Sequence, residues 1–159
     1  MKIRKVKANN RKRVFVVHST VGVFEFPYAK ADTKPTPEDP LDRFYVDPEL
    51  GNEAFTYVLK SGREDAIHID HVLAYNDDPS YMGDWALHLL TIRVIELVEA
   101  SGVSKREICR RLRTSPSQLY RLLDPANYNK SMRQVLALLH LLGYEVNFDV
   151  RKKETGVSA

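Results

Sequence analysis

Two helix-start signals, at Ser104 and Ser115, lie eleven residues apart and constrain the fold of this chain more than any other feature. Ser104 is followed three residues later by Glu107, a spacing typical of a capping box that satisfies backbone N–H groups at the start of a helix. Ser115 is followed by Pro116, which suits the first helical position because its missing N–H would be unpaired there. The segment therefore predicts two short helices joined by a turn of about three residues.

Leucine-rich positions give each of these helices one side to bury. Ile108 and Leu112 lie four residues apart in the first helix, and Cys109 adds a small side chain where another helix can approach closely. Leu119, Leu122 and Leu123 do the same for the second helix, which ends at Asp124 because a residue before proline is pushed away from helical geometry. The outward side of the second helix is polar and holds Ser117, Gln118, Tyr120 and Arg121.

Helices are also predicted on both sides of this pair. Trp85, Leu89, Ile92 and Leu97 recur at helical spacing until Ser101 and Gly102 end the pattern. A further helix is expected from Ser131 to Leu142, with Ser131 and Gln134 as a second capping box and Gly143 as the cap at its end.

Charge is unevenly distributed along the chain. The net charge is +3, from 24 Lys and Arg against 21 Asp and Glu. Residues 1–13 carry seven basic residues and no acid, residues 14–83 carry five bases and thirteen acids, and residues 103–123 carry six bases and one acid. A basic patch on about twenty residues beside an acidic half indicates a polyanionic partner for one region only.

These residues carry a resemblance to a known family. Residues 92–143 resemble the lambda-repressor-like (Cro/C1, XRE) DNA-binding domain, in the buried positions Ile108, Leu112, Leu119 and Leu122, the small residue Cys109 and the two flanking helices. The sequence departs from the family pattern at two positions of the turn. Arg113 stands where glycine is usual, so it is expected to adopt a positive φ at a small steric cost, and Thr114 replaces an apolar residue.

The resemblance implies a set of DNA-contacting residues, because in this family the start of the second helix enters the major groove. Base edges would be read by Ser115, Ser117, Gln118 and Arg121. Pro116 also faces the bases but could offer only apolar contact. The sugar–phosphate backbone would be contacted by Lys105, Arg113, Tyr120, Asn127, Tyr128, Asn129 and Lys130. Each of these positions also has an alternative role without DNA contact. Arg110 and Arg111 would then be solvated, Tyr120 would pack on its own helix, and Tyr128 would cover the core.

The first half of the chain has strand-like composition. Short β-branched or aromatic runs predict strands at Lys2–Val6, Arg13–His18, Val21–Phe26, Phe44–Val46, Phe55–Leu59 and Ala66–Ile69. Turns are expected at Ser19–Thr20 and Ser61–Gly62, and a proline-rich loop is expected over residues 27–42. This half weakly resembles small β-rich domains of the DUF2442-like type, but no motif is specific enough to carry functional residues over.

A last strand is predicted at Tyr144–Val150, where apolar and polar residues alternate without interruption. It could pair with its copy in a second subunit or with the β-rich first half. The first option favours a homodimer, which suits DNA half-sites related by twofold symmetry. The overall expectation is an α+β protein, with a β-rich partner-binding, ligand-binding or dimerisation domain at residues 1–80, a helix-turn-helix domain at 81–150 and a disordered tail at 151–159.

Several classes of protein are not expected. The single cysteine, Cys109, cannot form an internal disulfide and argues for a reducing environment. The basic start of the chain lacks the apolar stretch of a secretory signal, and the most apolar segment, residues 86–98, is too short for a membrane span. A cytoplasmic protein is therefore predicted.

Catalysis and cofactor binding are not expected either. The seven glycines are scattered, and no nucleophile–base set is evident. His68, Asp70 and His71 suggest a metal site, but a third ligand would have to come from elsewhere, such as His18 or His88, so ordinary histidines are the better interpretation. The leading hypothesis is a dimeric, sequence-specific DNA-binding regulator without metal or cofactor. The alternative is an antitoxin that binds its own promoter and masks a basic toxin with its acidic half.

Overall fold

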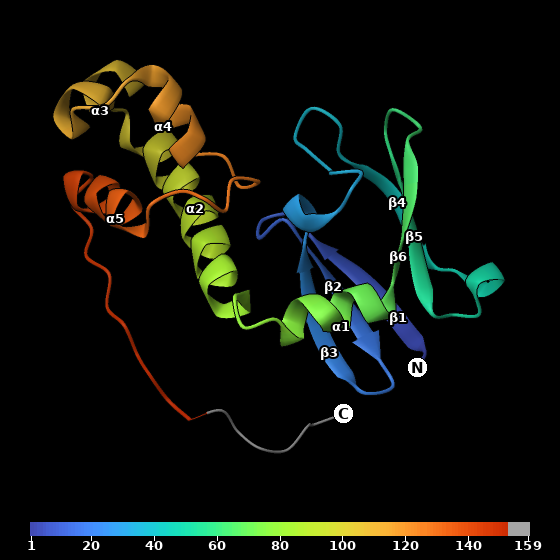
Figure 1. The fold of residues 1–159 in the computed structure, drawn as a ribbon. Coiled ribbons are helices and arrows are strands. Elements are labelled where there is room, and N and C mark those ends of the chain that lie inside the picture. Colours follow the sequence, from blue (N-terminus) through green and yellow to red (C-terminus); the bar gives the residue numbers. More distant parts are fainter. Residues whose placement is uncertain (153–159) are drawn as a thin grey trace. The chain divides into compact units, whose positions relative to one another are not determined.

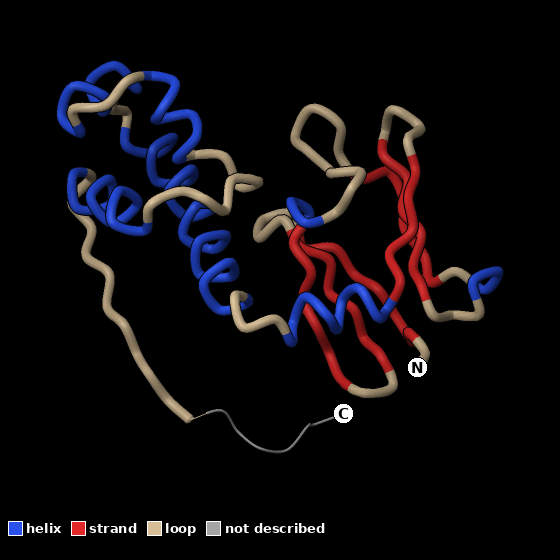
Figure 2. The backbone as a smooth tube through the Cα atoms, viewed as in Figure 1, coloured by secondary structure: helices blue, strands red, loops and turns tan. Residues whose placement is uncertain are grey.

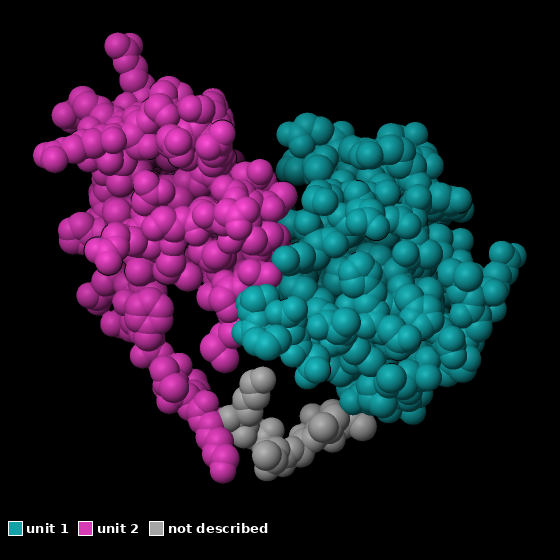
Figure 3. All heavy atoms as spheres, viewed as in Figure 1, with its two compact units in different colours: residues 1–81, 153–159 teal, residues 82–152 magenta. Residues whose placement is uncertain are grey.

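The computed structural model describes residues 1–152, and the chain divides into two compact units at residues 81 and 82 (Figures 1 and 3). All six described strands precede the five described α-helices. The predicted mixed α+β class is therefore confirmed. Each unit is described by itself below.

The first unit, residues 1–81, contains two three-stranded antiparallel sheets (Figure 2). The strands of the first sheet, in spatial order, are β1 (Ile3–Asn9), β2 (Val14–Ser19) and β3 (Gly22–Pro27). Those of the second sheet are β4 (Leu41–Val46), β5 (Ala54–Leu59) and β6 (Glu64–His68). Single turns of 3-10 helix, η1 (Tyr28–Lys30) and η2 (Pro48–Leu50), follow β3 and β4, and α1 (Ile69–Asp77) follows β6.

An aromatic cluster forms the core of this unit. The Phe15 ring is fully buried, and its centroid lies 4.8 Å from that of Tyr28, 4.9 Å from that of Phe55 and 5.0 Å from that of Tyr57. These four residues come from β2, η1 and β5, so the cluster joins the two sheets. Such tilted and edge-on ring pairs add stability beyond the area that they bury.

The second unit, residues 82–152, contains four helices. They are α2 (Tyr81–Ser101), α3 (Lys105–Leu112), α4 (Pro116–Leu122) and α5 (Met132–Leu141), with the first residue of α2 belonging to the first unit. Their shared core is made of buried apolar side chains from all four helices: Val94, Leu97, Val98, Ile108, Cys109, Leu119, Leu122, Val135, Leu138 and Leu139. The apolar positions predicted for the two short helices are thus in the core, with Leu112 and Leu123 half-buried at its margin.

The six strands predicted in the first half match the observed ones to within a few residues, but α1 was not expected. Its apolar residues Ile69, Val72 and Tyr75 recur every third position, and all three are buried. The helix is only nine residues long, and the predicted strand Ala66–Ile69 covered its first residue. Its start is set by His68, whose Nδ1 accepts a hydrogen bond from the backbone N–H of Asp70 at 3.1 Å. Histidine is not among the usual capping residues, so this start was hard to recognise.

The structure has no strand at Tyr144–Val150, so this part of the predicted fold is wrong. Among residues 1–152, neither sheet includes any residue after His68. An extended segment becomes a strand only when a neighbour completes its hydrogen bonds, and no described strand does so. Of the predicted tail, Arg151 and Lys152 have no regular structure, and residues 153–159 lie outside the described range.

No helix within residues 1–152 combines the length and apolar character that crossing a membrane requires.

The aromatic cluster predicts a large loss of stability when its central ring is removed. We expect Phe15→Ala to lower the free energy of unfolding by about 3–5 kcal/mol, because it leaves a cavity among three other rings. Urea unfolding followed by circular dichroism measures this loss. Val23→Ala is the control, since Val23 is 54% exposed on β3 and should cost about 0.5 kcal/mol or less. Equal losses in the two variants would contradict the assignment of Phe15 to the core.

Candidate nucleic-acid interface

Three serine caps fix where the short helices of the second unit begin. Ser104 Oγ accepts from the N–H of Glu107 at 3.1 Å, Ser115 Oγ from that of Gln118 at 3.2 Å, and Ser131 Oγ from that of Gln134 at 3.3 Å. Pro116 occupies the first turn of α4. All three predicted helix starts are therefore confirmed.

The turn between α3 and α4 is three residues long, and its backbone bends at Arg113. This residue has φ 56° and ψ 47°, the left-handed conformation that glycine adopts most readily. The bend lets the N–H of Thr114 donate to the carbonyl of Cys109 at 3.0 Å. The positive φ expected at Arg113 is thus confirmed, and its steric cost is partly offset by this terminal hydrogen bond.

The outward side of α4 is open to solvent and polar. Ser115, Ser117, Gln118, Tyr120 and Arg121 are all exposed, while Leu119 and Leu122 face the core. Tyr120 is 61% exposed, and the Lys105 Nζ at the start of α3 lies 5.2 Å from the centre of its ring. This cation–π contact brings two of the predicted phosphate-contacting residues from successive helices onto one surface.

Two of the six basic side chains in residues 103–123 are engaged by an acidic side chain. The Glu107 carboxylate accepts hydrogen bonds from the side chains of both Arg110 and Arg111. The Arg110 hydrogen bond, followed by that of Arg111, holds the pKa of Glu107 down at about 2. Within residues 1–152, no ion pair involves the other four bases of this segment, which are Lys105, Arg106, Arg113 and Arg121.

A groove of about 610 Å³ runs from α4 to the start of α5. It brings together five of the predicted site residues, namely Gln118, Arg121, Asn127, Asn129 and Lys130. Leu122, Asp124, Ser131 and Gln134 complete its lining. Ser131 and Gln134 were predicted only as a capping pair, and their place in the lining of this groove was not predicted. The sequence contained a signal for this position, because Ser131 directly follows Lys130 at the end of the predicted phosphate-contacting loop.

The loop after α4 is held in shape by its own side chains. Asn127 Nδ2 donates to the carbonyl of Arg121 at 3.1 Å, and Asn127 Oδ1 accepts from the N–H of Asn129 at 3.0 Å. Asn127 therefore shapes the loop with both ends of its amide, whereas Asn129 stays exposed.

Lys130 points inward, and its ammonium group ties the loop to two helices. Its Nζ donates to the Thr91 hydroxyl of α2 at 2.7 Å, to the Leu122 carbonyl at 3.1 Å and to the Asp124 carbonyl at 2.7 Å. An ammonium group has three N–H donors, so these acceptors use all of them. Burial lowers the pKa of Lys130 to about 8, and the nearby Asp124 charge acts in the opposite direction.

Tyr128 is the other predicted phosphate contact that lies partly inside the unit. It is half-buried, and burial, reinforced by the Asp84 charge, raises the pKa of its hydroxyl.

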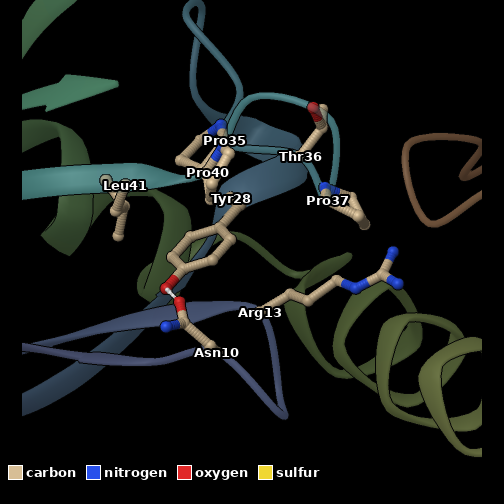
Figure 4. Close-up of a pocket in the computed structure, with 8 residues that line it drawn as sticks. All are labelled: Asn10, Arg13, Tyr28, Pro35, Thr36, Pro37, Pro40 and Leu41. Carbon is tan, nitrogen blue, oxygen red and sulfur yellow. Dashed lines mark hydrogen bonds between the residues drawn. The ribbon is translucent and has the colours of Figure 1, made fainter. Parts of the chain in front are cut away.

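The first unit has a cavity of its own, about 290 Å³ in volume (Figure 4). Tyr28 lies at its centre and donates from Oη to Asn10 Oδ1 at 2.7 Å. Pro35, Pro37 and Pro40, from the loop after η1, line the cavity. Arg13, Thr36 and Leu41 also line it. The prolines and Leu41 give the wall apolar surface, and Asn10, Arg13, Tyr28 and Thr36 give it hydrogen-bonding groups.

The histidines considered as metal ligands have ordinary surroundings. His68 caps α1 through Nδ1, and its Nε2 lies 3.6 Å from Glu53 Oε2. The His71 ring packs edge-on against Phe26, with 5.4 Å between the centroids. In the described part of the chain, no three His, Cys, Asp or Glu side chains are grouped so that they could hold a metal ion.

Comparison of the chain with protein-family models, with curated proteins and with solved structures gave no match.

The buried ammonium of Lys130 predicts a pH-dependent contribution to stability. The folded chain releases this proton near pH 8, whereas the unfolded chain keeps it until about pH 10.4. The unfolded state therefore binds more protons between these values, and the contribution of Lys130 to the free energy of unfolding should rise with pH across that window. It should be lost as the pH falls through 8.

Urea unfolding of the wild type and of Lys130→Met at several pH values from 7 to 10 measures this contribution as a difference. Groups common to both proteins cancel in that difference. Lys60→Met is the control, because it removes a lysine from an exposed position in the other unit and leaves the hydrogen bonds of Lys130 in place. A flat or falling difference for Lys130→Met would show that its proton is not released early.

Proposed function

We propose that the protein is a sequence-specific DNA-binding transcriptional regulator of the lambda-repressor-like helix-turn-helix kind. The observation that carries this proposal is the pair α3 and α4, joined by a three-residue turn, with the polar side of α4 exposed and its apolar side in the core. A helix presented in this way can enter a major groove, which is about 12 Å wide.

Sequence choice would come from the exposed residues of α4. Arg121 carries a forked donor that can bond guanine O6 and N7 together, and Gln118 can do the same to adenine N6 and N7. Ser115 and Ser117, whose hydroxyl oxygens lie 3.1 Å apart, would add short-range contacts at the start of the helix. Three of these four side chains carry no net charge, so Arg121 is the principal base-reading residue.

Affinity would come from contacts to the phosphate backbone. Lys105, Tyr120, Arg113 and Asn129 are exposed and can reach phosphates on either side of the reading helix. Lys130 and Asn127 take a different role in this proposal, because their polar groups hold the loop that would follow the backbone. Tyr128 is half-buried in the same loop.

The antitoxin alternative relied on the acidic excess of residues 14–83. The first unit also contains β1 and the seven bases of residues 1–13, which offset all but one of the net negative charges of its remaining residues. The charge of this unit as a whole therefore does not favour a basic toxin as partner. Co-purification of the product of a neighbouring gene would favour that alternative.

The proposal predicts that Arg121 carries sequence preference. Genomic fragments selected by the wild-type protein provide the operator, and fluorescence anisotropy then measures its affinity. We expect Arg121→Ala to weaken operator binding by roughly 5- to 150-fold, the value of one bidentate arginine–guanine contact. Arg121→Lys keeps the charge but loses the fork, so it should lose operator preference while retaining binding to unrelated DNA.

Arg43→Ala is the matched control, because it removes the same charge from an exposed position on β4 in the other unit. It should leave operator affinity within about twofold. Wild-type binding should also weaken steeply as salt rises, since phosphate contacts release counterions. Failure to select any fragment, or normal operator preference in Arg121→Lys, would contradict the proposed reading helix.

A further inference from the structure

The cavity of the first unit combines apolar surface with hydrogen-bond donors, and none of the eight described residues that line it is acidic. Its apolar surface comes from three prolines, Leu41 and the ring of Tyr28 (Figure 4). Asn10, Arg13 and Thr36 supply side-chain donors. A pocket of this composition favours a ligand with an apolar body and a negatively charged group.

Arg13 brings the positive charge of this lining. Its side chain is half-buried, and within residues 1–152 no ion pair or side-chain hydrogen bond engages its guanidinium group. By contrast, Lys2 and Arg63 of the same unit lie 3.2 Å and 3.1 Å from carboxylate oxygens. Partial burial of a cation without a counter-charge is unfavourable, and an anionic ligand would remove that cost.

The backbone of Arg13 is held in a conformation that is unusual for a bulky residue. Its φ is 54°, in the left-handed region that glycine adopts without steric cost. Its carbonyl accepts a hydrogen bond from the N–H of Tyr28 at 2.9 Å, so the turn is tied to the residue at the centre of the cavity. Residues strained in this way concentrate at binding sites. The hairpin turn thus carries a cation at a position where glycine would be less strained.

The Tyr28 hydroxyl adds no negative charge to the cavity. Burial raises the pKa of this hydroxyl, so it stays protonated and neutral in the ordinary pH range. It donates to Asn10 Oδ1 at 2.7 Å, and within residues 1–152 the Nδ2 group of the same amide has no acceptor. In the view of Figure 4, Asn10 lies beside the Tyr28 hydroxyl and the Arg13 guanidinium lies on the Pro37 side. The cavity is therefore rich in donors at both places.

The proline loop that forms one wall is already fixed. The N–H groups of Thr36 and Asp39 each donate to the other residue's carbonyl, both at 3.1 Å. The Asp39 carboxylate in turn accepts from the Ser61 hydroxyl at 2.7 Å and from Arg63 at 3.1 Å. Each proline also fixes its own φ. A ligand therefore has little to order on binding, and the acid of this loop is engaged by other side chains.

The size of the cavity limits the ligand. At about 30 Å³ for each water-sized atom, a volume of about 290 Å³ holds roughly ten non-hydrogen atoms. A carboxylate can accept two parallel hydrogen bonds from a guanidinium group. A flat ring can pack against the Tyr28 ring and the proline rings, and ring pairs add stability beyond the area that they bury.

We propose that this cavity binds a small aromatic monocarboxylate, with the carboxylate on the Arg13 guanidinium and the ring between Tyr28 and the proline loop. Charge complementarity selects the carboxylate, and the apolar wall excludes an anion without an apolar body. The inference goes beyond the proposed function and does not depend on DNA binding.

Isothermal titration calorimetry of the full chain without DNA tests the proposal, with benzoate as the probe. Benzoate should bind with a dissociation constant below about 1 mM, which is within the range for a ligand of this size. Benzamide has the same shape without the charge and should bind at least about tenfold more weakly, because it loses the charge-assisted hydrogen bonds. Inorganic phosphate should bind at least about tenfold more weakly, because it lacks the apolar ring.

Variants of Arg13 separate binding from folding. Arg13→Gly suits the positive φ, so its urea midpoint should be at least that of the wild type, while its benzoate affinity should fall by about tenfold or more. Arg13→Lys keeps the charge but loses the fork, so its affinity should lie between those of the wild type and Arg13→Gly. Arg4→Ala is the matched control, because it removes an arginine from an exposed position on β1 outside the cavity. It should bind benzoate within about twofold of the wild type.

Amide chemical shifts locate the site. Benzoate should shift the amide signals of Asn10, Tyr28 and Thr36 in a nuclear magnetic resonance titration of the wild type. Absence of benzoate binding, equal affinity for benzamide, or shifts confined to residues 82–152 would overturn the proposal. Wild-type affinity in Arg13→Gly would do so as well, and if that variant failed to fold, undiminished affinity in Arg13→Lys would have the same meaning. Because no DNA is present, these results are separate from those that test the regulator proposal.

Discussion

The helical unit depends on a small apolar core that its shortest helices cannot do without. Helix α3 has eight residues and α4 has seven, and isolated helices of this length are unstable in water. Ile108, Leu119 and Leu138 are at most 2% exposed, and they bring α3, α4 and α5 together. Because α4 owes its position to this contact, its exposed polar side is held at a fixed angle. A loop with the same residues could not present Gln118 and Arg121 as a rigid pair.

Around that core, polar groups divide between holding the scaffold and facing solvent. Glu107 accepts hydrogen bonds from Arg110 and Arg111, and the Lys130 ammonium group donates to α2 and to the end of α4. Lys105 and Arg121 are left at the surface. The effective basic patch is therefore smaller than the six bases of residues 103–123 suggest, and it is concentrated near α4. A smaller patch relies more on specific contacts and less on charge alone.

The sequence predicted features that depend on neighbouring residues better than features that depend on residues far away in the chain. The serine caps at Ser104, Ser115 and Ser131 act within three residues, and the left-handed turn at Arg113 was expected because the family that the segment resembles usually has glycine there. All of these features were predicted from the sequence. The helix α1 was missed because its cap is a histidine, and the strand at residues 144–150 was assigned to a chain that offers it no neighbour. The hydrogen bonds of the Lys130 ammonium group were not predicted, because nothing in the sequence places Thr91 beside it.

By itself, the amino-acid sequence determined that a strand-rich half precedes a helical one, the serine caps of the helical half and the residues on the outward side of α4, because these depend on neighbours within one or two turns. Only the tertiary structure decided which polar side chains remain exposed on that surface. The donors of Lys130 are taken by residues up to 39 positions away, and the groove joins α4 to Ser131 and Gln134 of the following helix. Such contacts depend on how the helices pack, which local patterns do not encode.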